Sequence, residues 1–387
     1  MDLSRSRYGD LAGGETTAHQ HLSDESFLTA IIEFERALTD VAESLGVIGA
    51  READAARDAY ERHRLDVAEV SRASAAGGNP AIPIVAGIKA LTPGHTRGVH
   101  TGATSQDAVD TALVLCVRRA GEVIAAQLGE VEELLGQLAL THRATPVMGR
   151  TLGQQALPTT FGLVAAGWLS AVHRAGEEFS RAVAALPVQY AGATGTLAAV
   201  HPHGVALHDG LADRLGLAAR PLVWHTDRLP FTAVGVAAAQ LCGAVRKVAG
   251  DIIASSASEI GELAEASPGG SSSMPHKANP AAAVACDGYA RRAPGLAATL
   301  LDALDCRWQR GVGSWHAEWQ VLRDLVAVTA SAVSRLHASL DGLRINTATM
   351  ARNMAVTGNG PESATGHAHE LVDLILADLN QERTHDE

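Results

Sequence analysis

The chain has 387 residues, of which 47% are hydrophobic and only 4% aromatic, and its formal net charge is -12 at pH 7. This length and hydrophobic content allow a large core, and the scarcity of aromatic side chains favours closely packed helices built from small apolar residues. The acidic charge argues against a nucleic-acid partner, because no basic stripe is available to neutralise phosphates.

The cysteines are far apart in the sequence and lack metal-type spacing, which predicts buried, reduced thiols. Residues 1–8 do not contain the apolar core of a signal peptide, and no uninterrupted apolar run is long enough to cross a membrane. The sequence therefore predicts a soluble, cytoplasmic protein with no membrane partner.

The N-terminal region, residues 1–97, is predicted to be a small helical domain. After a loop through residue 22, Ser23 or Asp24 can cap a first helix, whose apolar residues recur every three or four positions until Gly46 ends it. A more polar helix is predicted over residues 50–75. A Gly-Gly-Asn-Pro sequence then breaks the pattern before a short apolar helix over residues 82–91.

The central region, residues 98–345, is predicted to be a bundle of five long helices. They cover residues 107–141, 158–185, 230–266, 280 onward with a kink at Pro294, and 315–340. At about 1.5 Å per residue, the longest would exceed about 50 Å, which their own chain cannot cover. We therefore expect an all-α fold whose bundle also packs against neighbouring subunits. Residues 346–387 are expected to form only a reduced C-terminal helical segment.

A first block of polar residues lies in the stretch 100–111, just before the longest predicted helix. Thr104, Ser105 and Gln106 offer hydroxyl and amide donors immediately ahead of Asp107, which can cap the helix. Such a group suits the binding of a carboxylate. A plain capping motif without a ligand explains the same residues.

A second block covers residues 149–162. Thr151, Gln154 and Gln155 are polar side chains that could contact a substrate. Arg150 is either a cation for an anionic substrate or a structural ion-pair residue.

The third block, residues 269–280, reads Gly-Gly-Ser-Ser-Ser-Met-Pro-His-Lys-Ala-Asn-Pro. Pro268 and the glycines end the preceding helix and free the backbone of the loop. Pro280 suits the first position of the next helix with Asn279 as its cap, so that the free N–H groups and the positive helix end face the loop. We expect an anion to bind there. A flexible Gly/Ser linker is the alternative interpretation.

Together the three blocks resemble the fumarase/aspartase superfamily, whose signature is Gly-Ser-Ser-x-Met-Pro, one residue, Lys, one residue, Asn-Pro. The resemblance implies tetramers with a central helical bundle and active sites shared between subunits. It also implies a small carboxylate substrate and chemistry without a metal or another cofactor. His201, His203 and His208 are accordingly not expected to bind a metal, since no carboxylate-histidine helix motif accompanies them.

The resemblance also implies roles for single residues. Ser271, the first serine of the signature, is the base, and Lys277 and Asn279 stabilise the aci-carboxylate that forms when a proton leaves the carbon next to a carboxylate. The implied substrate contacts are Thr104, Ser105, Gln106, Thr151, Gln154, Gln155, Met274, Lys277 and Asn279.

One position departs from the superfamily pattern. Many members carry a histidine after the Arg-Thr of the second block, where this chain has Leu152, which cannot transfer a proton. The acid for the leaving group then comes from elsewhere, with His100 as the candidate, or the leaving group needs little help. A purely structural role for His100 is the alternative.

Within the superfamily the resemblance is strongest to 3-carboxy-cis,cis-muconate cycloisomerases, which close a lactone by the reverse of a β-elimination. The segments that carry it are residues 78–80, 103–107, 157–162 and 313–319. Ala278, Thr101 and the short C-terminal region depart from that branch. Two alternatives therefore stay open: a lyase that releases fumarate from a substituted succinate, such as nitrosuccinate or an N-succinyl compound as in adenylosuccinate lyase, and a non-catalytic structural member of the fold.

Overall fold

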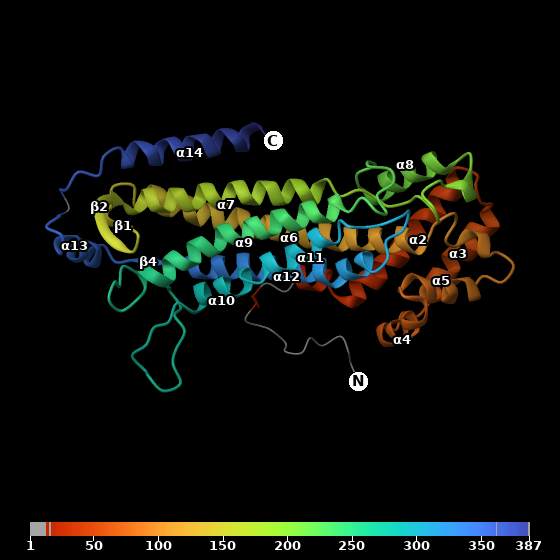
Figure 1. The fold of residues 1–387 in the computed structure, drawn as a ribbon, viewed down its shortest axis with the longest axis horizontal. Coiled ribbons are helices and arrows are strands. Elements are labelled where there is room, and N and C mark those ends of the chain that lie inside the picture. Colours follow the sequence, from red (N-terminus) through yellow and green to blue (C-terminus); the bar gives the residue numbers. More distant parts are fainter. Residues whose placement is uncertain (1–12, 15–16, 361, 386–387) are drawn as a thin grey trace.

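The computed structural model describes residues 13–14, 17–360 and 362–385, and this part of the chain is an elongated bundle of helices (Figure 1). Its longest members are α6 (Ser105–Thr141), α7 (Phe161–Ala184), α9 (Leu229–Ser255) and α12 (Ser314–Leu340). Small and branched apolar side chains such as Val117, Ile124 and Val245 are fully buried between them. The predicted helical fold with a long central bundle is confirmed.

Two of the five predicted central helices differ from the prediction at their ends. The helix predicted to reach residue 266 ends at Ser255, because the following residues turn and form strand β3 (Leu263–Ala264). The helix predicted from residue 158 begins at Phe161, since Pro158 belongs to strand β2 (Gln154–Thr160). The predicted kink at Pro294 is a full break, which separates α10 (Ala281–Ala290) from α11 (Ala293–Asp302).

The N-terminal helices lie together at one end of the bundle (Figure 1). They are α2 (Asp24–Ser44), α3 (Ala50–Arg62), α4 (Val67–Gly77) and α5 (Ala81–Ala90), followed by the short helix η2 (Thr96–Gly98). Ser23 caps α2, as predicted, by accepting a 3.1 Å hydrogen bond from the N–H of Ser26.

Two details correct the sequence-based expectations for the N-terminal region. The stretch predicted as one helix over 50–75 is two helices, because residues 63–66 are not helical. Residues 17–21, predicted as loop, form helix α1 (Thr17–His21). Helix α8 (Gly204–Leu215), from the middle of the chain, packs against α2, and the short helix η3 (Ala198–Val200) precedes α8 in the chain. The statement about the signal sequence concerns residues 1–8, which lie outside the described residues.

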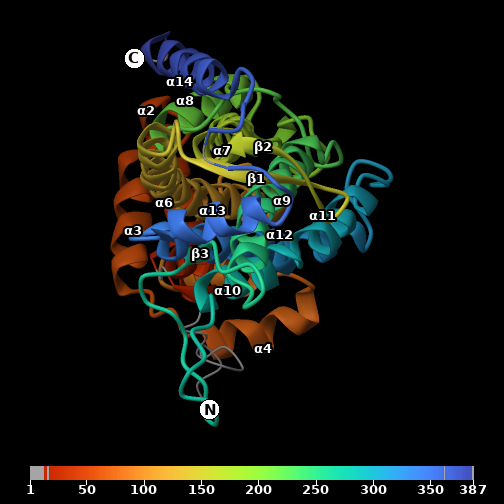
Figure 2. The ribbon, with the colours of Figure 1, turned by 90° about the vertical axis from the view of Figure 1, so that its left-hand side faces the viewer.

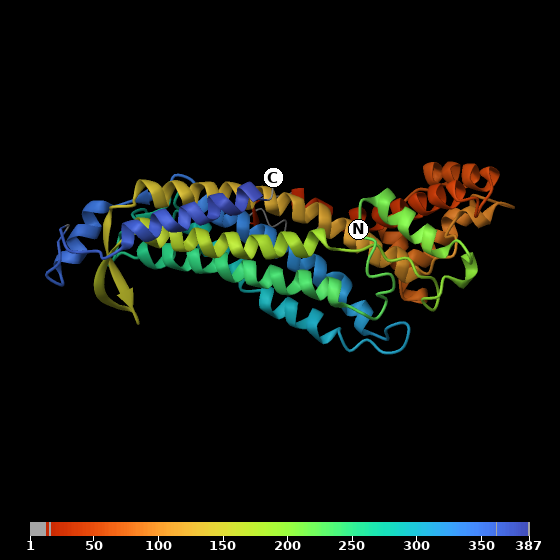
Figure 3. The ribbon, with the colours of Figure 1, turned by 90° about the horizontal axis from the view of Figure 1, so that it is seen from above.

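The opposite end of the bundle carries two small antiparallel sheets. Strands β1 (Pro146–Thr151) and β2 form a hairpin, and β3 pairs with β4 (Arg344–Ile345). Helix α13 (Thr347–Ala355) packs on β1, and α14 (Ala368–His385) runs back along α7, as Figure 3 shows. The C-terminal segment therefore covers this end and one side of the bundle.

Helix α9 is long and apolar enough, by length and composition, to cross a membrane. Half of its most apolar window is nevertheless buried inside the protein, where it packs against α7, α10 and α12. Its apolar composition is that of a central core helix.

Candidate active site

The three sequence blocks lie at two opposite ends of the bundle. The first block stands at the start of α6, beside the N-terminal helices, whereas the hairpin of the second block and the loop of the third stand at the other end, which faces the viewer in Figure 2. Helix α6 has 37 residues and is therefore about 55 Å long. A single chain thus brings the second and third blocks to one end and holds the first block far from both.

The buried side chain of Asp107 accepts the hydrogen bonds that hold the first block in place. Thr104 is the N-cap residue of α6, and Asp107, in the third helical position, accepts a 2.9 Å hydrogen bond from the N–H of Thr104. The same fully buried carboxylate accepts bonds from the N–H groups of Ala191 and Gly192 and from Nε2 of His225, at 3.0 to 3.1 Å and 2.7 Å. Thr104, rather than Asp107 as predicted, is therefore the N-cap residue, and Asp107 completes the capping box and fixes two distant segments against the start of α6.

Arg310 is a member of this site that the sequence interpretation missed. Its Nε donates to Oε1 of Gln106 at 2.8 Å, and its Nη1 donates to Oγ1 of Thr104 at 2.5 Å. Gln106 is fully buried and its Nε2 donates to the carbonyl of His225, so both ends of its amide hold protein groups. Thr104 and Ser105 remain partly exposed beside a cation. No motif marked Arg310, which lies in the loop between α11 and α12.

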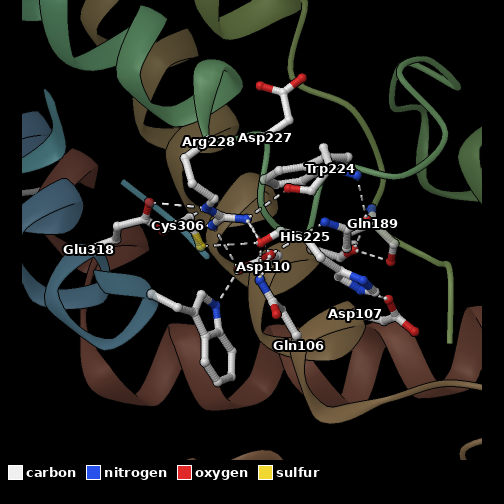
Figure 4. A network of polar contacts seen from close by, with 12 residues as sticks. Gln106, Asp107, Asp110, Gln189, Trp224, His225, Asp227, Arg228, Cys306 and Glu318 are labelled. Carbon is white, nitrogen blue, oxygen red and sulfur yellow. Dashed lines mark hydrogen bonds and ion pairs between the residues drawn. The ribbon is translucent and has the colours of Figure 1, made fainter. Parts of the chain in front are cut away.

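A buried network of ion pairs lies inside the end of the bundle that carries the first block (Figure 4). Arg228, fully buried, donates to the carboxylate of Asp110 at 2.8 Å and to that of Glu318 at 2.6 Å. Asp110 also accepts from the indole N–H of Trp315. One guanidinium thus faces two carboxylates in a dry interior. Burial raises the pKa of Glu318 to about 7, although the charge of Arg228 opposes this shift.

His100 is the first residue of the first block and is bound by a carboxylate. Its Nδ1 is 2.6 Å from Oε1 of Glu35, and its backbone N–H donates to Oε2 of Glu35 at 2.9 Å. Burial lowers the pKa of His100, but the charge and hydrogen bond of Glu35 outweigh it, and the pKa is raised above that of a free histidine. The side chain of His100 is 15% exposed, and that of Glu35 is fully buried.

In the signature loop, Ser271 accepts hydrogen bonds from the backbone. Its Oγ lies 3.4 Å from the N–H of Ser273 and 3.2 Å from that of Met274. The loop is closed at its base by two backbone bonds between Gly269 and Asn279, and Nδ2 of Asn279 donates to the carbonyl of Gly270. Backbone N–H groups directed at the serine oxygen favour its deprotonated form.

The start of α10 does not have the free N–H groups that the sequence suggested. Pro280, not Asn279, occupies the N-cap position, and the carboxylate of Glu265 accepts bonds from the N–H of Ala282 at 3.2 Å and of Ala283 at 2.8 Å. The prediction of an anion site at this helix end is therefore wrong, because the buried carboxylate of Glu265 already accepts these hydrogen bonds.

The hairpin of the second block projects from the bundle. Thr151, Gln154 and Gln155 are exposed, and Leu152, at the tip, is fully exposed with a left-handed φ of 52°. Arg150 donates two hydrogen bonds to the buried carboxylate of Glu262, at 2.8 and 2.6 Å. The structural role considered for Arg150 is thus the one that its contacts show.

The three histidines at 201, 203 and 208 do not gather around a common point for a metal. His208 is fully buried, and its two ring nitrogens lie 3.0 Å from the carbonyl of Tyr190 and 2.9 Å from that of Ala219. Across the described residues, no group of three histidine, cysteine, aspartate or glutamate side chains is arranged to hold a metal ion.

Comparison with known proteins shows which family the chain matches and which enzymes it is similar to. The chain matches a family described as "Lyase" over residues 20–295. It is 40% identical to a nitrosuccinate lyase from Streptomyces davaonensis, over 89% of this chain and 76% of the relative. It is 35% identical to a 3-carboxy-cis,cis-muconate cycloisomerase from Pseudomonas putida, over 94% of this chain and 87% of that protein.

Solved structures agree with these relatives. The 3-carboxy-cis,cis-muconate lactonizing enzyme from Pseudomonas putida is similar with a TM-score of 0.85 and 32% identity, over 97% of this chain and 89% of that one. A fumarate lyase from Mesorhizobium sp. BNC1 is similar with a TM-score of 0.81 and 29% identity, with the same coverage. The chain therefore belongs to the lyase family of the fumarase/aspartase superfamily, whose members named here are lyases and cycloisomerases.

Proposed function

We propose that the protein catalyses a β-elimination, or its reverse, on a small di- or tricarboxylate, with Ser271 as the base. The observation that carries this proposal is the bonding of Ser271, whose Oγ accepts two backbone N–H groups inside a loop that also contains Lys277. An unperturbed serine is too weak a base at neutral pH. Donors directed at the oxygen lower the free energy of the alkoxide, and closure of the exposed loop over a substrate would remove competing water.

Removal of the proton next to a carboxylate places two negative charges at one end of the substrate. The ammonium group of Lys277 is exposed in the loop and is the nearest cation in sequence to Ser271. It can stabilise this aci-carboxylate together with the loop N–H groups. Asn279 contributes by fixing the loop through its bonds to Gly269 and Gly270. Met274 is exposed in the same loop and is proposed to contact the substrate.

The first block binds a second carboxylate. Thr104 and Ser105 present hydroxyl groups at the start of α6, and Arg310 brings a guanidinium to the same place. A positive helix end and a cation together suit an anionic group. Gln106 serves as the support that holds Arg310 in position. Thr151, Gln154 and Gln155 add contacts from the exposed hairpin.

A complete site requires more than one subunit. The two ends of the bundle are separated by the length of α6, so Ser271 and Thr104 of the same chain do not act on one small substrate. Subunits that pack with opposite ends adjacent bring the blocks together. We therefore propose a homotetramer with shared active sites in the cytoplasm.

For the substrate, cycloisomerisation of a carboxymuconate is the first candidate. Its supports are the cycloisomerase relatives, such as the one from Pseudomonas putida, and Leu152, which suits a carboxylate leaving group that needs no strong acid. The second candidate is elimination of nitrite from nitrosuccinate with release of fumarate. Its support is the 40% identity to a nitrosuccinate lyase, and nitrite also leaves without protonation.

The purified protein should be assayed with 3-carboxy-cis,cis-muconate for lactone formation and with nitrosuccinate for the ultraviolet absorbance of fumarate. An N-succinyl compound and the Ser271→Ala variant complete the panel. Lactone formation that is lost in the variant supports the first candidate, and fumarate from nitrosuccinate alone supports the second. Absence of turnover with every compound would sink the proposal.

A further inference from the structure

Glu35 and His100 are joined by two hydrogen bonds that involve both the ring and the backbone of His100. Both carboxylate oxygens of Glu35 are used by this one residue, Oε1 by the ring Nδ1 and Oε2 by the backbone N–H. A carboxylate only accepts hydrogen bonds, so Nδ1 must carry a proton. The ring orientation and the protonation of Nδ1 are therefore both fixed by Glu35.

The backbone beneath the pair is constrained as well. His100 has a left-handed φ of 60°, which is uncommon for a residue with a side chain and occurs where the surrounding structure imposes it. Gly98, just before it, lies so close to α3 that an added Cβ would stand 2.3 Å from the carbonyl oxygen of Glu52. The hydroxyl of Thr39 donates to the carbonyl of Gly98 at 2.7 Å. The turn that carries His100 is thus locked against α2 and α3.

Because Nδ1 is bonded to Glu35, Nε2 is the ring nitrogen of His100 that is available to bind a substrate. Among the described residues Nε2 of His100 has no hydrogen-bond partner, and the side chain keeps some exposure at 15%. His100 stands four positions before Thr104, at the end of the molecule that carries Arg310. A histidine with one nitrogen bonded to a carboxylate and the other open is arranged to donate a proton.

We propose that Glu35 is a positioning residue, which orients His100 so that Nε2–H meets the leaving group of the substrate. This inference rests on the proposed function. In elimination, Ser271 takes the proton from carbon, the C–H electron pair passes into the aci-carboxylate and then forms the carbon–carbon double bond, and the leaving group departs with its bonding pair as an anion that Nε2–H stabilises by a hydrogen bond. In the addition direction the same atoms move in reverse. His100 thereby supplies the hydrogen-bond donor for the leaving group that the side chain of Leu152 cannot provide.

The charged groups around His100 make the idea testable in two directions. Glu35 on α2 and Asp107 on α6 raise the pKa of His100, whereas burial and Lys89 on α5 lower it. Because the protonated ring is the active form, turnover should fall as pH rises through this pKa. Removing the charge of Glu35 should move that fall to lower pH, and removing the charge of Lys89 should move it to higher pH.

The experiment measures the pH dependence of kcat and kcat/KM with whichever of carboxymuconate or nitrosuccinate the wild type converts. We expect Glu35→Gln to shift the alkaline limb to lower pH, Lys89→Gln to shift it to higher pH, and His100→Gln to remove it with a loss of about 10- to 100-fold in kcat, as for a lost hydrogen bond to a charged group. Glu132→Gln is the matched control, because Glu132 pairs with the buried His173 at 3.2 Å between α6 and α7.

A uniform loss of kcat in Glu35→Gln with an unmoved limb would show a merely structural pair and overturn the proposal. So would a limb that persists in His100→Gln. Titration of the histidine ring nitrogens by NMR, with the His100 signal identified from His100→Gln, gives a readout without turnover. If no substrate is converted, the proposed function fails, but an equal His100 titration in wild type and Glu35→Gln would overturn the role of Glu35 separately. Thermal unfolding checks that each variant is folded.

Discussion

Arg150 and Glu262 join the second block to the segment that directly precedes strand β3. The guanidinium donates two nearly parallel bonds to a carboxylate that is 2% exposed, and Asn353 of α13 donates a third, of 2.7 Å. The hairpin, the residues before β3 and α13 are therefore held together by one buried charge. Such a carboxylate is stable only while its partners remain.

Removal of this guanidinium should destabilise the end of the bundle that carries the loop. In Arg150→Met, Glu262 keeps only Asn353, and we expect the free energy of unfolding to fall by about 2 to 3 kcal/mol, below the range for fully buried pairs because Arg150 is partly exposed. Denaturant unfolding measures it. Arg143→Met is the matched control, since the side chain of its partner Asp373 is 54% exposed, whereas that of Glu262 is 2% exposed. An equal loss in both variants would contradict the assignment.

Replacement of Ser271 should lower turnover far more than replacement of a neighbouring serine. Ser271→Ala is expected to lower kcat by about 10²-fold or more, because it removes the proposed base. Ser272→Ala is the control and should leave turnover and the loop unchanged, since Ser272 is exposed. Steady-state kinetics, with the oligomeric state checked by light scattering, tests this. Comparable loss in both variants would point to a general effect on the loop.

Arg310 should act mainly on substrate binding. Arg310→Met removes a cation and two hydrogen bonds from the first block, and we expect kcat/KM to fall by about 10- to 100-fold, as for a lost bond to a charged group. Arg307 lies in the same loop, is exposed and pairs with Asp305. Arg307→Met should therefore retain wild-type kinetics. A change confined to kcat in Arg310→Met would argue against carboxylate binding.

Glu318 should make stability depend on pH. Its pKa is raised from 4.5 to about 7 in the folded protein, so the folded state binds this proton more tightly than the unfolded state. The resulting stabilisation is fully present below pH 4.5 and is lost as pH rises through about 7. It amounts to about 3 kcal/mol.

Glu318→Gln should lack this component. The difference in unfolding free energy between wild type and variant should therefore change between pH 5 and pH 8, with the wild type losing more stability as pH rises. Urea unfolding at several pH values measures it. A difference that stays constant over this range would mean that Glu318 is already ionised in the folded state.

Much of the fold and the outline of the site follow from local sequence. The recurrence of apolar residues every three or four positions predicts α2, because this helix must bury one stripe of its surface. The signature around Ser271 and Lys277 likewise stands in one continuous segment. Chemistry that is concentrated within a few consecutive residues is visible without a structure.

What the sequence could not determine depends on contacts between residues far apart in the chain. The carboxylate of Glu265 fills the helix end that Asn279 and Pro280 had suggested for an anion. Arg310 reaches Thr104 across 206 positions, and Glu35 reaches His100 across 65. Periodicity and motifs describe neighbours along the chain, whereas burial, charge pairing and the separation of the two ends by α6 arise only when the helices pack. The sequence by itself therefore determined the main helices and the signature loop, and the tertiary structure decided which charges meet at each end.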